Sequence, residues 1–133
     1  MAALLRSYLS EAAKRGFVWG QHDCMLFAAG WVQEVCGVDP AAEWRAQYAA
    51  DPRAATLEHQ PRIGEAMHDA LTALGWRTVS VVSLEGGDVV LAAPRDGGPH
   101  RAAIAVGGSK IAMLTRTGLV VAPAHVLRAW RYA

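Results

Sequence analysis

Residues 17–42 read FVWGQHDCMLFAAGWVQEVCGVDPAA, and this stretch decides how the chain is organised. Within it, Phe27, Trp31 and Val35 recur every four residues, which is the spacing of one face of an α-helix. Asp23 belongs to a residue type that caps helix starts, and Gly37 to the type that ends helices. The stretch therefore predicts a helix that begins at Cys24 and stops at Gly37.

The two cysteines of the chain, Cys24 and Cys36, fall at opposite ends of this predicted helix. At a rise of 1.5 Å per residue, the helix separates them by about 18 Å. A disulfide requires Cα atoms within about 7 Å of each other. The spacing therefore predicts that the cysteines are not bonded to each other and have different roles.

Apolar residues elsewhere divide the chain into a helical half, residues 1–75, and a strand half, residues 76–133. Further helices are predicted at residues 3–15, 40–50 and 63–74, and strands at residues 77–82, 88–92, 101–106, 110–114, 119–121 and 128–132. Because short turns separate the strands, we expect antiparallel neighbours in chain order. This order predicts one α+β domain over residues 1–133, with N-terminal helices packed on an antiparallel β-sheet meander.

Composition excludes several classes of protein. The 133 residues are 53% hydrophobic and 19% charged, which is typical of one folded domain and not of a disordered chain. A net charge of +1 gives no reason to expect a nucleic-acid partner. No apolar run approaches the roughly 20 residues of a membrane span. The first residues lack the pattern of a signal peptide, so we expect synthesis in a cytoplasm without one.

Cys24 is the strongest candidate for chemistry. The start of a helix favours negative charge and lowers the pKa of a thiol, which produces the nucleophilic thiolate. Such a nucleophile also needs a histidine base and backbone N–H groups that hold an oxyanion. The alternative interpretation of Cys24 is a buried structural cysteine, which is a common core residue.

Among the five histidines, His100 is the best placed to act as the base, because it directly precedes the predicted strand RAAIAV. His22 lies two residues before Cys24, and we expect His22 and Asp23 to line the same cleft. The other three, for which we expect surface or satisfied roles, are His59, His68 and His125.

A metal site is the competing interpretation of His22, Asp23 and Cys24. No CxxC or HxxxH pair accompanies these three ligand types, whereas structural zinc usually takes four ligands from such pairs. We therefore expect no metal and no cofactor.

Four further side chains have expected positions. Trp19 and Trp31 bracket the Cys24 region as possible walls of a cleft, although most tryptophans of the chain are expected in the core. Trp130 is expected to point inward from its strand, opposite Arg131. We expect Asp88 to open a strand and to bond to nearby backbone N–H groups.

The residues W-G-x-x-D-C, the F-A that follows, and G-x-D-P resemble the opening signature of a phage- and prophage-associated family of unknown function. That family is itself similar to the NlpC/P60 group of papain-like cysteine peptidases. Later pieces occur in a matching order: GGDVVLA, AIAVGG, KIAML, GLVVAP and RAWRY. The resemblance runs from about Phe17 to Tyr132.

The resemblance implies a papain-like fold of the NlpC/P60 type, with Cys24 at the position of the nucleophile and Asp88 at a Gly-Asp position. Arg101 occupies the position of the peptidase histidine in the strand register and is therefore expected to line the cleft, and His100 lies one residue earlier. A one-residue slip turns a strand side chain to the opposite face of the sheet. A β-bulge could return the side chain to the original face. The third polar residue of the peptidase triad falls near Met113, which cannot orient an imidazole.

By resemblance, the expected function is that of a protein associated with the tail tip of a phage or gene-transfer agent. It would be made in the bacterial cytoplasm and built into a virion tail or tail-like particle. Its expected partners are tail or baseplate proteins and the peptide of the cell wall, whose amide bonds Cys24 and His100 would hydrolyse. The alternative is a catalytically inactive structural subunit of the tail tip or baseplate.

Overall fold

The computed structural model describes residues 1–18, 22–42, 63–94, 97 and 100–132. Within these residues the protein is an α+β structure in which the helices precede the sheet, as the sequence predicts. The helices are α1 (Ala2–Ala13), α2 (Cys24–Cys36) and α4 (Ile63–Ala73). The strands are β1 (Trp76–Val79), β2 (Val89–Ala93), β3 (Arg101–Gly107), β4 (Lys110–Thr115), β5 (Gly118–Pro123) and β6 (His125–Tyr132).

Each of the six predicted strands is confirmed, with ends that differ by a few residues. The helix predicted at residues 40–50 lies almost entirely outside the described residues. No helix within the described part of the chain is long and apolar enough to cross a membrane.

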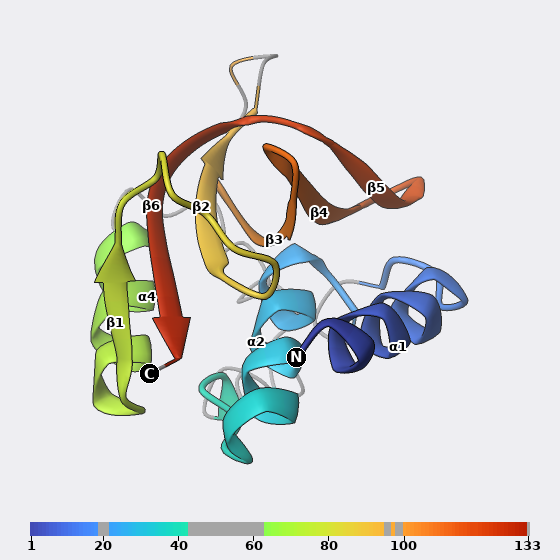
Figure 1. The fold of residues 1–133 in the computed structure, drawn as a ribbon. Coiled ribbons are helices and arrows are strands. Elements are labelled where there is room, and N and C mark those ends of the chain that lie inside the picture. The colour runs from blue at the N-terminus through green and yellow to red at the C-terminus, as the bar shows by residue number, and fades with distance from the viewer. Residues whose placement is uncertain (19–21, 43–62, 95–96, 98–99, 133) are drawn as a thin grey trace.

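The strands form one antiparallel sheet in the order β1-β6-β2-β3-β4-β5. The expectation of a simple meander is therefore wrong in one respect: β2 to β5 form a meander, but β6 returns to lie between β1 and β2. The reason is the connection between β5 and β6, which is Ala124 alone. The chain runs straight on from the edge strand and, because the sheet curls, meets β2 on the far side (Figure 1).

Alternation along β2 defines the two faces of this curled sheet. Val89 and Leu91 belong to the core that the helices cover, which we call the helix-facing side. Val90 and Ala92 point the other way, into a second buried cluster on the concave side. Both faces of the central strands are therefore buried, as the continuous apolar run of β2 requires.

Small side chains allow the sheet to curl so tightly. Four of the six buried residues of the concave cluster are alanines: Ala92, Ala103, Ala105 and Ala129. A larger side chain at these positions would overfill the space between strands that face each other across the curl, which typically costs about 1–3 kcal/mol.

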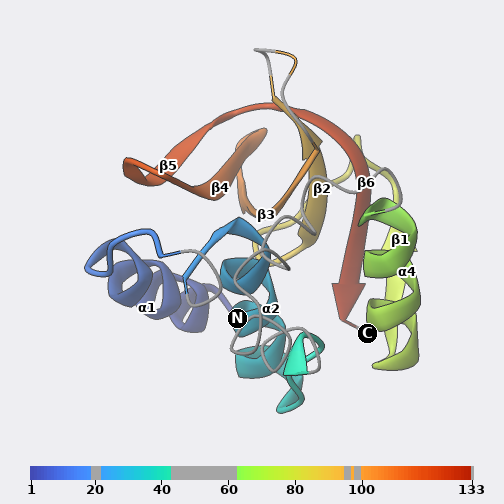
Figure 2. The ribbon, with the colours of Figure 1, turned by 180° about the vertical axis from the view of Figure 1, so that it is seen from behind.

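The helices cover one face of the sheet. In Figure 2, seen from behind, α2 lies between α1 and α4. α2 packs on β3 and β4, while α4 packs on β1. Helix α1 contacts α2 closely, because the Tyr8 hydroxyl donates a hydrogen bond to the Phe27 carbonyl. Gly30 permits this approach, since a Cβ atom there would collide with the Tyr8 hydroxyl.

Trp31 fixes α2 to the sheet. Its indole Nε1 donates a hydrogen bond of 2.8 Å to the carbonyl oxygen of Gly87, and the ring is fully buried. The expectation that Trp31 walls a cleft is therefore wrong. The side chain is a core residue whose polar atom has the partner that a buried indole needs.

Asp88 and Arg131 form an ion pair between the start of β2 and the end of β6. Arg131 Nε and Nη2 donate to the two carboxylate oxygens of Asp88, each at 2.8 Å. Asp88 also accepts from the backbone N–H of Glu85, as predicted for a residue that opens a strand. Asp88 is almost fully buried, so this pairing satisfies a carboxylate that has no access to water.

Trp130 is fully buried and points inward, as predicted. Its indole Nε1 donates a hydrogen bond of 3.2 Å to His68 Nδ1, so His68 on α4 has a satisfied structural role. The Arg128 guanidinium lies 5.2 Å from the centre of the Trp130 ring and donates to the carbonyl of Gly64. β6 thus ties α4 to the sheet.

The ion pair predicts a large difference between two substitutions. Arg131→Met leaves the buried Asp88 carboxylate without its charged partner, and we expect the free energy of unfolding to fall by about 3 kcal/mol. Glu85→Gln removes a 69% exposed carboxylate that lies 3.4 Å from Arg131 Nε, and should cost less than about 0.5 kcal/mol. Urea denaturation measures both. Equal losses in the two variants would contradict this role for Asp88.

Candidate functional site

Asp23 sets the start of α2. Its backbone is extended, with φ −121° and ψ −179°, and its Oδ1 accepts a hydrogen bond of 2.9 Å from the backbone N–H of Leu26. At the other end, Gly37 takes the left-handed conformation with φ 82°. Both predicted helix limits are confirmed. Asp23 is itself almost fully buried, so its carboxylate serves the helix as a cap.

Cys24 is the first residue of α2 and has no solvent-exposed surface. Cys36 is the last residue of the same helix and is half-buried. The prediction that the two cysteines do not form a disulfide with each other is confirmed. The thiol at the helix start thus lies inside the protein, where a polymeric substrate cannot reach it without movement of the surrounding chain.

His22 joins α1 to the start of α2. Its Nε2 lies 3.2 Å from the carbonyl oxygen of Ala12, and its backbone pairs with Val18 in both directions. A hydrogen bond to a carbonyl requires that Nε2 carry the proton. Burial lowers the pKa of His22 below its ordinary value, and the positive charge of Arg15 lowers it further. The Ala12 hydrogen bond and Asp23 act in the opposite direction.

The side chain of His22 also lines a polar cleft between α1 and α2. The cleft has a volume of about 230 Å³. It is lined by Leu4, Ser7, Tyr8, Glu11, Ala12, Arg15, His22 and Glu34. Its described lining does not include Cys24, so His22 and Cys24 do not share this cleft. Trp19, predicted as another cleft wall, lies outside the described residues.

Arg101 is the first residue of β3 and pairs with Ala92. Ala102 and Ile104 belong to the helix-facing core, whereas Ala103 and Ala105 belong to the concave cluster. Because side chains alternate along a strand, Arg101 lies on the concave side. Helix α2 covers the opposite side of β3, so Arg101 does not face α2.

His100 directly precedes β3 and is exposed to solvent. Cys24 is fully buried, so the exposed His100 and the thiol lie in different environments. The assignment of His100 as a base stays a prediction. Met113, at the expected position of the third triad residue, packs against the concave cluster.

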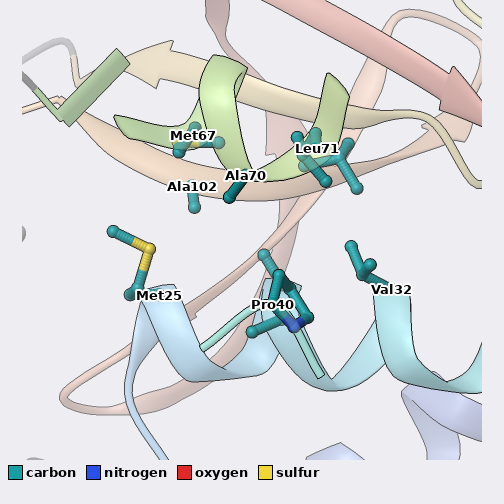
Figure 3. A pocket seen from close by; sticks show the side chains of 10 residues that line it. Met25, Val32, Pro40, Met67, Ala70, Leu71 and Ala102 are labelled. Atoms are coloured by element: carbon teal, nitrogen blue, oxygen red, sulfur yellow. The ribbon is translucent and has the colours of Figure 1, made fainter. Parts of the chain in front are cut away.

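A small apolar cavity of about 30 Å³ lies one helical turn beyond Cys24, between α2 and α4 (Figure 3). Met25 and Met67 face each other across it, with Ala102 of β3 behind. Such a volume holds about one water, but a lining of carbon and sulfur offers that water no partner. Sequence reasoning missed this cavity, although the alanines on facing elements, such as Ala70 and Ala102, were the available signal.

The described residues contain no cluster of side chains that could serve as metal ligands. No three of their His, Cys, Asp and Glu side chains come together in a group that could hold a metal ion. Although adjacent in sequence, His22 and Asp23 are committed to Ala12 and Leu26.

The chain belongs to a family that is described as a domain of unknown function (DUF6950), whose model matches residues 2–132. A search among curated proteins finds no match. The match covers both the helical half and the strand half, so the family is defined over the whole fold described above.

Removal of the helix cap should destabilise the protein. We expect Asp23→Ala to lower the free energy of unfolding by about 1 kcal/mol, because the Leu26 N–H loses its acceptor. Asp23→Asn keeps an acceptor oxygen and should retain most of the stability. Chemical denaturation of both variants is the measurement, and an equal loss in the two would contradict the capping role.

The lowered pKa of His22 predicts a loss of stability in acid. The unfolded chain, where the pKa is near 6.5, binds the proton more readily than the folded protein. The free energy of unfolding should therefore fall as the pH decreases below about 6.5 and continue to fall until the folded-state pKa is passed. His22→Gln should reduce this fall, while His125→Gln, at an exposed position, should not. Urea titrations over this pH range provide the comparison; identical slopes in all three proteins would refute the assignment.

Proposed function

We propose that this protein is a structural subunit of a phage tail tip or a tail-like particle, built on an NlpC/P60-like fold whose cysteine site is closed. The sequence signature around Cys24 supports the relationship to that fold. The burial of Cys24 carries the proposal of a closed site, because a nucleophile that acts on wall peptides must meet its substrate.

The strand residues at the matching peptidase positions support the same proposal. Arg101 stands where those enzymes have their histidine, and a guanidinium stays protonated at neutral pH, so it cannot accept a proton from a thiol. Met113 stands where a polar side chain would orient the imidazole. A fold can be retained for assembly after its chemistry is lost, since function resides in the site and not in the fold.

Hydrolysis of amide bonds in cell-wall peptides is the second candidate. One specific observation favours it: Cys24 keeps the first position of a capped helix, where the helix dipole stabilises a thiolate and backbone N–H groups are available for an oxyanion. In that case His100 would accept the proton of Cys24, and the buried thiol would have to become accessible to the substrate.

Assembly is the direct test of the proposed function. Co-expression with the neighbouring tail proteins should yield a stable complex that contains this chain, and Cys24→Ala should leave the complex intact. A strictly monomeric protein that binds no tail component would contradict the proposal.

Thiol reactivity separates the two candidates. In the folded protein near neutral pH, we expect iodoacetamide to alkylate half-buried Cys36 faster than buried Cys24, and the two rates to converge in urea. Peptide mapping by mass spectrometry measures each rate. Selective labelling of Cys24, together with release of wall peptides that Cys24→Ala abolishes, would instead establish the hydrolase.

A further inference from the structure

Strand β5 is an edge of the sheet with unusual exposure. Its sequence GLVVAP contains no charged residue, and β4 is its only partner in the sheet order of the described residues. Val120 and Val121 point to opposite faces and are 41% and 50% exposed. An edge strand presents N–H and C=O groups that another strand can pair with, so proteins usually protect such edges with charge or a cover.

The opposite edge of the same sheet carries that protection. β1 has only four residues, includes the exposed Arg77, and is packed against α4. Shortness, charge and a covering helix are three devices that prevent pairing at an edge. β5 has six residues and no charge. Although α1 contacts β5 and Pro123 ends it, Val120 and Val121 stay exposed.

An apolar groove accompanies β5 on the concave side. Its lining is apolar except for one hydroxyl, and consists of Pro94, Ile111, Met113, Thr115, Val120, Ala122, Pro123 and Ala124. A strand that paired with β5 would direct every second side chain to this side. When a peptide adds a strand to a sheet edge, backbone hydrogen bonds commonly supply the affinity. A groove of this kind then selects which side chains the peptide can carry.

Charge decides which kind of strand fits. Residues 97–133 contain five Lys and Arg residues but no Asp or Glu. Lys110 is exposed and pairs with Pro123 at the end of β5, close to the exposed His125. A second copy of the chain would bring the same carboxylate-free segment against itself, whereas an acidic segment of another protein would be complementary.

We propose that β5 is a docking edge for an extended segment of another protein. This segment adds a seventh strand to the sheet, places aliphatic side chains at alternate positions in the groove beside Met113 and Val120, and carries carboxylates at the end that meets Lys110. The proposal does not depend on any chemistry at Cys24.

Fluorescence anisotropy with labelled peptides tests this surface. The probe is the peptide EEVTVTVTEE, compared with KKVTVTVTKK and with two N-methylated forms, one methylated at the valines and one at the threonines. In a paired strand only alternate N–H groups face the neighbour. We therefore expect one methylated form to bind about tenfold more weakly or worse, and the other to bind like the parent.

The protein variants give the matched control. Lys110→Glu should weaken binding of the acidic peptide several-fold, while Arg77→Glu on the opposite edge should leave it unchanged; circular dichroism verifies that both variants fold. Four results would overturn the proposal: no binding of the acidic peptide, equal binding of the lysine-flanked peptide, equal binding of both methylated forms, or an unchanged affinity in Lys110→Glu. Binding of single-stranded DNA or anionic vesicles in place of the peptide, or a dimer that excludes it, would also overturn it.

Discussion

The paired hydrogen bonds between Asp88 and Arg131 are the interaction on which the fold depends most. They join the start of β2 to the end of β6, two segments that lie 43 residues apart in the sequence. The residue before Asp88 is Gly87, whose carbonyl accepts the hydrogen bond of Trp31 from α2. One short segment therefore connects the central helix, the meander and the returning strand.

This connection explains why the sheet can bury both faces. β6 is held between β1 and β2, so the sheet curls and encloses its concave cluster, while α2 and α4 cover the other side. The curl also leaves β5 at an open edge, because the chain continues directly from β5 into β6 and no further strand follows to pair with β5 in the described structure. Exposure at β5 and burial at β2 are thus consequences of the same topology.

Local sequence signals predicted much of this arrangement. The helix over Cys24–Cys36 follows from its apolar spacing and from its caps, Asp23 and Gly37, and the six strands follow from alternation and glycine-rich turns. These signals act over a few residues. The position of β6, the partner of Asp88 and the contact between Trp130 and His68 depend on residues brought together from distant parts of the chain, which a single sequence does not encode as a pattern.

The site shows the same division. The sequence placed Cys24 at a helix start, because a cap is a local feature, but could not give its burial, which is a property of the folded chain. Alternation along β3, fixed by Ala102 and Ile104 against the helices, assigns Arg101 to the concave side.

The most direct test of the closed site is a crystal structure in which the distance from Cys24 Sγ to the nearest ring nitrogen of His100 is measured. If the protein is a structural subunit, we expect the sulfur and the ring nitrogen to be separated by well over about 4 Å, with Cys24 still enclosed. A ring nitrogen within about 3.5 Å of the sulfur, in a site open to solvent, would contradict the account and establish a working pair.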